Sequence, residues 1–196
     1  MLWMITDFSK YRTVSEAIDH ISMCLKSGVA KVTLRNTQIY SGNLICEIKD
    51  VLDARFPDKE IFIHDPSVEE IKRFRHLHFP SKRIDEAINV KKDHPEKTIA
   101  LSTHHGTEYE KAFDNGIDFA FFSPVFKPLS KPDDIRDTVL PINVKNLYLL
   151  GGIDKMKALL LIEKGFFNLA GISLFNEENA EDDIKELIKK TTEMEL

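Results

Sequence analysis

Eight short apolar runs alternate with longer amphipathic stretches along the whole chain, and this alternation restricts the fold more than any other feature. Each run is short and rich in Ile, Val, Leu or Phe, which is typical of parallel strands buried on both faces. The runs cover residues 2–6, 29–34, 60–64, 76–79, 98–102, 118–122, 147–150 and 168–172. The pattern therefore indicates a parallel sheet whose strands are joined by helical crossovers.

The stretches between the runs have helical spacing of their apolar residues. The expected helices cover residues 14–26, 43–55, 67–74, 84–92, 107–114, 155–164 and 177–192. Eight strands alternating with seven or eight helices predict an α/β fold, a single (β/α)8 TIM barrel over residues 1–196, rather than an open doubly wound sheet. Residues 127–146 are the exception, and we expect a long loop there with one helical turn at 133–136.

Charge and cysteine content exclude several classes of function. The chain has 27 Lys and Arg against 32 Asp and Glu, a net charge of −5, which argues against a protein that coats nucleic acid or an anionic membrane. A local basic site for a phosphorylated small molecule is compatible with this balance. Cys24 and Cys46 are too few for a disulfide framework and are expected to be inert core thiols. Without a membrane-length apolar run or a cationic leader, we expect a cytoplasmic protein.

In this fold, functional side chains follow the carboxyl ends of the strands. Arg35 follows the second expected strand, where it either binds phosphate through two hydrogen bonds or is a solvated loop residue. Asp65 follows the third, where it either holds a metal ion or caps the next helix, and the residues alone favour the cap.

Histidines and a serine mark the ends of the fourth and fifth strands. His78 and His104 are interpreted as polar lining of the pocket mouth, close to Ser102. A zinc site is disfavoured, because no third ligand stands at metal-binding spacing. Arg83, with its neighbour Lys82, places two cations directly after the fourth strand.

The last two strand ends carry the residues expected to bind phosphate. Gly151 and Gly152 follow the seventh run, and Ile172 and Ser173 follow the eighth. Glycine allows backbone N–H groups to approach an anion closely, and these two loops form the recurrent phosphate site of such barrels. The alternative interpretation is that the glycines only serve tight turns.

The order of the motifs resembles the thiamine-phosphate synthase family, which includes thiazole tautomerases of the TenI type. The resemblance covers nearly the whole chain and rests on LWMITD, VTLRNT, IFIHDP, ALSTHH, FAFFSPVFKPLSKP, LLGGI and LAGISLF. It is strongest in SPVFKPLSKP and GGI. The resemblance implies a (β/α)8 barrel that joins hydroxymethylpyrimidine diphosphate to thiazole phosphate with Mg²⁺ and releases pyrophosphate.

The resemblance also assigns roles to individual residues. It implies that Arg35 binds the diphosphate, that Asp65 binds Mg²⁺, and that Ser130 and Lys131 close over the diphosphate. The fixed cations and Mg²⁺ would then stabilise negative charge on the leaving group. By the same resemblance, Ser102 lies near the pyrimidine, and the thiazole phosphate binds at Gly151, Gly152, Ile172 and Ser173.

Several positions depart from the family pattern. Thr33 and Thr37 stand where the family has Gln and Lys, and His64 stands where it has Asn. Arg83 stands in place of the second magnesium aspartate, which argues against Mg²⁺ and for a direct contact with phosphate. Pro124 stands where the tautomerases have a histidine.

The prediction is therefore a synthase-like enzyme for phosphorylated thiazole and pyrimidine compounds. Thr33, His64, His78, Arg83 and His104 complete the expected substrate site. One alternative is a TenI-like tautomerase with His78 or His104 as the acid and base. Another is a non-catalytic phosphate-ligand binder descended from a synthase. The sequence leaves the oligomeric state open, a homo-oligomer included.

Overall fold

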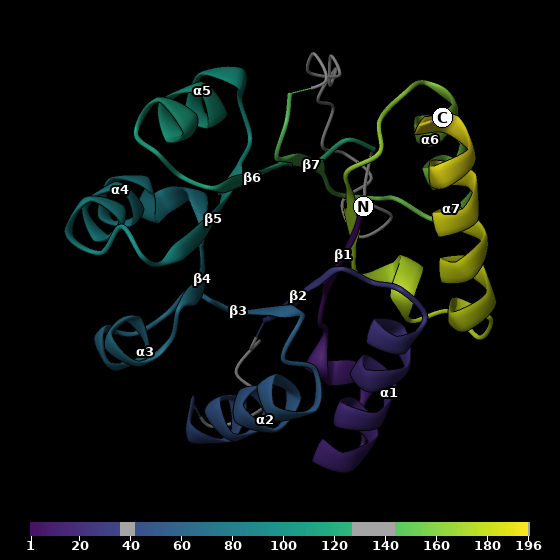
Figure 1. The fold of residues 1–196 in the computed structure, drawn as a ribbon, viewed down its shortest axis with the longest axis horizontal. Coiled ribbons are helices and arrows are strands. Elements are labelled where there is room, and N and C mark those ends of the chain that lie inside the picture. The colour runs from purple at the N-terminus through teal and green to yellow at the C-terminus, as the bar shows by residue number, and fades with distance from the viewer. Residues whose placement is uncertain (36–41, 127–143, 196) are drawn as a thin grey trace.

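The strands form a closed barrel in which every neighbouring pair is parallel (Figure 1). This computed structural model describes residues 1–35, 42–126 and 144–195. The strands are β1 (Leu2–Ile5), β2 (Lys31–Leu34), β3 (Glu60–His64), β4 (His76–Phe79), β5 (Thr98–Thr103), β6 (Phe119–Phe122), β7 (Leu147–Leu149) and β8 (Leu169–Gly171). The predicted (β/α)8 fold is confirmed.

Helices surround the barrel and link successive strands from β1 to β6 and from β7 to β8 (Figure 1). They are α1 (Val14–Lys26), α2 (Gly42–Arg55), α3 (Val68–Arg73), α4 (Ile84–Asp93), α5 (Gly106–Asp114), α6 (Lys155–Glu163) and α7 (Ala180–Glu195). Short 3-10 turns follow three strands, at Phe8–Lys10, Ser81–Arg83 and Ser173–Phe175. The helical turn expected at 133–136 lies outside the described residues. Within the described residues, no helix is long and apolar enough to cross a membrane.

The barrel closes because its first strand pairs with both its second and its last. Trp3 lies opposite Lys31 of β2 on one side and opposite Ala170 of β8 on the other. The C-terminal helix α7 packs against α6 and α1, so that the last helix covers the place where the chain closes on itself (Figure 1).

Polar side chains fix where the helices begin. The Thr13 side chain accepts a hydrogen bond from the backbone N–H of Glu16 and caps α1. Ser67 and Glu70 form a reciprocal capping box at the start of α3. Asp65 is therefore not the cap of this helix, which corrects the interpretation that its sequence position favoured.

The strands alternate between two apolar layers, because successive side chains point to opposite faces. The larger layer packs between the strands and the helices, and it includes the free, buried thiols of Cys24 and Cys46. Burial raises the pKa of Cys24 to about 12, which keeps this thiol protonated and inert. The smaller layer fills the barrel and consists of Trp3, Ile5, Phe62, Ala100, Phe121, Tyr148 and Ala170.

The barrel interior changes from aromatic to polar towards the carboxyl ends of the strands. The Trp3 ring lies 4.6 Å from Phe62 and 4.7 Å from Phe121, between ring centroids. Beyond this aromatic layer, Thr33 and His78 occupy interior positions nearer the carboxyl ends. Polar chemistry inside the barrel is therefore directed towards one end, which we call the mouth.

Candidate active site

A cavity of about 770 Å³ opens at the mouth beside the ends of β7 and β8. The four residues expected to bind phosphate, Gly151, Gly152, Ile172 and Ser173, all line it. The other lining residues are Asp7, Lys10, Leu150, Ile153, Asp154, Lys157, Gly171, Asn176 and Glu177. The cavity is large enough for a small phosphorylated ligand.

The backbone conformation and the packing at Gly151 and Gly152 require glycine, whether or not a ligand binds there. Both have positive φ, 103° and 65°. A Cβ on Gly151 would lie 2.8 Å from Pro124 Cα, and one on Gly152 would lie 2.8 Å from the carbonyl oxygen of Phe126. The loop after β6 is hydrogen-bonded to the same segment, because Phe126 N–H donates to Gly151 O at 3.0 Å. Both glycines therefore also serve packing.

Backbone N–H groups, rather than side-chain cations, are the anion donors that this cavity offers. Gly152 N–H donates to no acceptor within the described residues, and Ser173 N–H is the first of its 3-10 turn. The ammonium of Lys157 is already engaged, at 2.9 Å from Gly152 O and 2.9 Å from an Asp154 carboxylate oxygen. The remaining charged side chains are Lys10, Asp7 and Glu177, so the walls carry no excess of positive charge.

Arg35 stands at the mouth directly after β2, which β1 separates from β8 in the barrel. Its backbone N–H donates to Thr6 Oγ1 at 2.9 Å, which fixes the start of the side chain. Its Nε is buried and has no hydrogen-bond partner among the described residues. A buried guanidinium N–H without an acceptor is costly, and an anionic ligand at the mouth would satisfy it.

Arg83 and Asp65 form an ion pair at the ends of β3 and β4. Arg83 Nη1 lies 2.5 Å from Asp65 Oδ1 and donates to Pro66 O at 2.8 Å. Arg83 Nε and Nη2 bind the two Glu86 carboxylate oxygens at 2.7 and 2.6 Å. The hydrogen bonds that Arg83 donates to Glu86 and Asp65 raise its pKa. The guanidinium is therefore permanently charged and held between two carboxylates.

This arrangement does not fit Mg²⁺. The carboxylate that the family resemblance assigns to the metal is occupied by a guanidinium, and the Lys82 ammonium lies 3.9 Å from its other oxygen. Among the described residues, no group of three or more His, Cys, Asp or Glu side chains could hold a metal ion. Hard divalent cations need several free oxygen ligands. We therefore derive no chemical step through magnesium.

The histidines at the ends of β3 and β4 are neutral. Burial, together with the charges of Arg35, Lys82 and Arg83, lowers the pKa of His64 to about 4, although Asp65 opposes the shift. Burial also holds the pKa of His78 well below its ordinary value. His78 is 1% exposed and stacks on Phe121, with the ring centroids 4.5 Å apart. His78 therefore lies beneath the mouth.

Thr33 and Ser102 contact His78 from the two sides. Thr33 Oγ1 lies 3.1 Å from Nδ1, and Ser102 Oγ lies 2.9 Å from Nε2. His104 is exposed at the rim, where its Nδ1 lies 2.7 Å from Ser123 O. Ser130, Lys131 and Thr37 lie outside the described residues, as does most of the predicted loop at 127–146.

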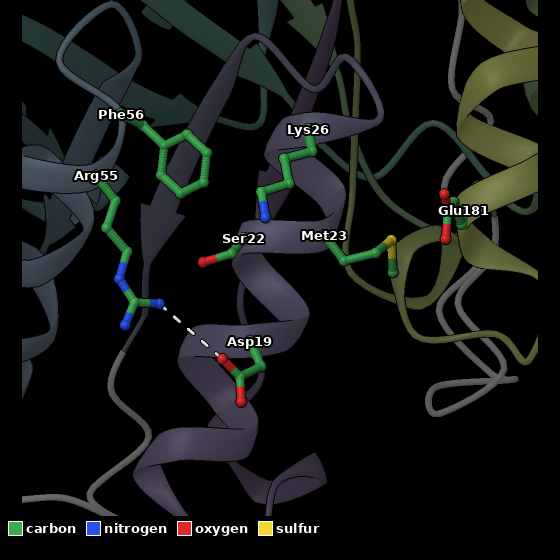
Figure 2. Close-up of a pocket in the computed structure, with 7 residues that line it drawn as sticks. All are labelled: Asp19, Ser22, Met23, Lys26, Arg55, Phe56 and Glu181. Atoms are coloured by element: carbon green, nitrogen blue, oxygen red, sulfur yellow. Dashed lines mark ion pairs between the residues drawn. The ribbon is translucent and has the colours of Figure 1, made fainter.

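A second hollow lies outside the barrel and shares none of these residues. It is lined by Asp19, Ser22, Met23, Lys26, Arg55, Phe56 and Glu181. Figure 2 shows Arg55 of α2 facing Asp19 of α1, and their charged atoms are 4.0 Å apart with both side chains mostly exposed. Met23 and Glu181 lie on the other side of α1 in this view (Figure 2). Because this hollow contains none of the residues predicted to bind substrate, the candidate site is the mouth.

Glu86 and Thr6, which hold arginines of the mouth in place, carried no role in the sequence analysis. Glu86 follows Arg83 by three positions on the adjoining helical turn, a spacing that favours an ion pair and that the sequence does contain. Thr6, which holds the Arg35 backbone, gives no such signal, because its contact joins β1 to the end of β2.

The geometry defines a single (β/α)8 barrel with a polar mouth that combines a glycine-lined cavity and an arginine whose buried Nε has no partner in the described part of the chain. The model of the family described as thiamine monophosphate synthase matches residues 2–175. The chain belongs to this family, which is a family of transferases in thiamine biosynthesis.

Individual relatives agree with this membership. The chain is 27% identical over 185 residues to "Putative thiamine-phosphate synthase 2" of Aquifex aeolicus, covering 90% of this chain and 97% of that protein. It is 27% identical to a thiamine-phosphate synthase of Prochlorococcus marinus, covering 91% of this chain but 54% of that longer protein. A thiamine phosphate pyrophosphorylase of Pyrococcus furiosus has the same fold, with a TM-score of 0.69 at 18% identity over 98% of this chain and 96% of that one.

Proposed function

We propose that this protein joins a phosphorylated thiazole to a hydroxymethylpyrimidine diphosphate to give thiamine phosphate and pyrophosphate. In this reaction the carbon–oxygen bond to the diphosphate breaks, and pyrophosphate leaves with the electron pair of that bond. The thiazole supplies the electron pair of the new bond to the pyrimidine carbon. Membership of the thiamine monophosphate synthase family supports this substrate pair.

The observation that carries the proposal is the buried Nε of Arg35, which has no hydrogen-bond partner among the described residues. The Arg35 backbone is held at the mouth by Thr6. A fixed cation that interacts more strongly as negative charge develops on a leaving diphosphate stabilises the transition state more than the ground state. Arg35 is therefore the residue that we assign to the diphosphate.

The cavity beside β7 and β8 is the proposed place of the thiazole phosphate. Its N–H donors at Gly152 and Ser173 suit the oxygens of a phosphate. The proposal gives each substrate its own part of the mouth, with the diphosphate near β2 and the thiazole phosphate near β7 and β8. Lys131 remains a sequence-based candidate for contact with the diphosphate.

No observation favours the tautomerase over the synthase. Both ring nitrogens of His78 are engaged, with Thr33 and Ser102, and its low pKa makes it a weak base at neutral pH. His104 has one ring nitrogen bound to the backbone at Ser123. A non-catalytic binder would bind the same substrates as the synthase, so only the absence of turnover would distinguish it.

Pyrophosphate release from the two substrates tests the proposal. We expect turnover by the wild type, and Arg35→Gln should lower kcat/KM by about 10²-fold or more. Arg55→Gln is the matched control, because Arg55 is exposed on the outside of the barrel. The assay is run with Mg²⁺ and with EDTA, since the Arg83–Asp65 pair predicts little difference between them. Thiazole isomerisation without the pyrimidine would instead support the tautomerase, and binding of both substrates without turnover would support the binder.

A further inference from the structure

A row of four hydrogen-bonded side chains crosses the barrel interior and ends at the mouth. Trp3 Nε1 donates to Thr33 Oγ1 at 2.9 Å, and Thr33 Oγ1 lies 3.1 Å from His78 Nδ1. His78 Nε2 lies 2.9 Å from Ser102 Oγ. Trp3 and Thr33 are 0% exposed and His78 is 1% exposed, whereas Ser102 is partly exposed. Ser102 is therefore the one member of the row that a ligand at the mouth can reach.

His78 carries a single ring proton. It is enclosed by Phe121, stacked at 4.5 Å, and by His64, whose ring lies edge-on at 5.0 Å. The charge of Arg35 disfavours a positive charge on His78, and His64 would add to this effect only if it were protonated. Burial adds to this effect, so the pKa of His78 lies well below its ordinary value. A neutral imidazole has one donor nitrogen and one acceptor nitrogen.

The indole of Trp3 decides which nitrogen holds that proton. An indole N–H can only donate, so Thr33 Oγ1 accepts from Trp3. If His78 carried its proton on Nδ1, Thr33 would accept twice, and its own buried hydroxyl hydrogen would have no acceptor among the described residues. With the proton on Nε2, Thr33 O–H donates to Nδ1, and every buried group in the row is satisfied.

The donor–acceptor direction of these hydrogen bonds determines what Ser102 can offer to a ligand. His78 Nε2–H donates to Ser102 Oγ, which leaves the hydroxyl hydrogen of Ser102 free to donate into the mouth. We infer that Thr33 and His78 are positioning residues that hold Ser102 as a hydrogen-bond donor, so that the mouth selects a ligand with a hydrogen-bond acceptor at this point. That this ligand is the pyrimidine substrate, with an unprotonated ring nitrogen as the acceptor, rests on the proposed function.

The exposure of Ser102 determines how strongly the site discriminates between ligands. A site that hydrogen-bonds a ligand atom discriminates strongly when its own polar group is left buried and unpaired. Ser102 is partly exposed, so water replaces part of a lost contact. We expect about a 10-fold rise in KM for the pyrimidine substrate when the donor is removed, with a smaller change in kcat.

The first experiment measures the proton position itself in the ligand-free protein by ¹⁵N–¹H NMR of the histidine rings. We expect wild-type His78 to be the Nε2–H tautomer throughout the neutral pH range. Thr33→Ser keeps the hydroxyl and should keep this tautomer. Thr33→Val removes the donor to Nδ1, so the preference for the Nε2–H tautomer should weaken, although valine gives an Nδ1–H no acceptor. A wild-type protein with the proton on Nδ1 would overturn the inference, whatever the protein catalyses.

The second experiment measures pyrimidine KM and kcat for Ser102→Ala, Thr33→Val, Thr33→Ser and Thr103→Val. Thr103 is the matched control, because it is a fully buried threonine of β5 whose hydroxyl donates to Phe121 O at 2.8 Å, outside the row. We expect Ser102→Ala and Thr33→Val to raise KM, and Thr33→Ser and Thr103→Val to leave it near the wild-type value. Equal KM effects in Thr33→Val and Thr103→Val would reduce Thr33 to a structural residue. An inactive wild type with the expected tautomer would refute the proposed function alone.

Discussion

Replacing Gly152 by alanine should cost far more stability than the same change at Gly165. Gly152 has φ 65°, and a Cβ there would lie 2.8 Å from the carbonyl oxygen of Phe126. Gly165 has a similar φ of 85°, but nothing lies within 4 Å of its added Cβ. The pair therefore separates backbone strain from steric contact.

The magnitudes follow from these two environments. A left-handed alanine costs about 1–2 kcal/mol, offset by about 0.4–1 kcal/mol from the stiffer unfolded chain. Gly165→Ala should therefore lose about 1 kcal/mol. Gly152→Ala must also move the Phe126 carbonyl by about 0.6 Å to reach the 3.4 Å of an ordinary contact. An overpacked site adds about 1–3 kcal/mol, so the total is about 3 kcal/mol.

Thermal melts and thiazole phosphate titrations of the two variants are the assay. For a chain of this length we expect Tm to fall by about 3 °C in Gly165→Ala and by about 10 °C in Gly152→Ala. Thiazole phosphate affinity should fall only in Gly152→Ala, because the displaced loop narrows the cavity. Equal Tm losses would refute the reasoning, since the loop after β6 would then yield to the new methyl group without cost.

Three further outcomes are expected. Arg83→Asp should create a Mn²⁺ site with Asp65 and Glu86, detected by electron paramagnetic resonance, and Mn²⁺ binding by the wild type would contradict the ion-pair argument. Folding stability should fall as pH decreases from about 6.5 to about 4, because unfolded His64 takes up a proton at its ordinary pKa while the folded pKa is about 4. Urea denaturation of His64→Gln should show a shallower fall, and an unchanged slope would exclude His64 as a source. Lys131→Ala should lower kcat/KM by about 10²-fold with less than about 0.5 kcal/mol loss of stability, and a folded variant with wild-type rates would remove its predicted role.

The sequence predicted the barrel well because each strand is a short apolar run between polar residues. The runs at 60–64 and 76–79 coincide with β3 and β4, and their ends follow from local composition. The strand order followed from the alternation with helices, because parallel neighbours need a crossover connection. The sequence therefore located the strand ends at which the mouth residues lie.

The pairing of the mouth residues could not be predicted in the same way. Arg83 was expected to face a phosphate, whereas the structure places it against Asp65 and Glu86. Asp65 has φ 51°, a backbone conformation that residue type alone does not specify. The capping role of Ser67 was readable, because Glu70 follows it by three positions.

The closing pair of β1 and β8 has a consequence for how the chain reaches this fold during synthesis. Leu2 finds its partner only when Leu169 has been made, so one edge of β1 stays open while almost the entire barrel emerges from the ribosome. An unpaired apolar strand edge invites pairing with other chains. Contacts that span so much sequence also slow folding, since a long loop must close before they form. The vulnerable interval of this protein therefore lasts until its final β/α unit is translated.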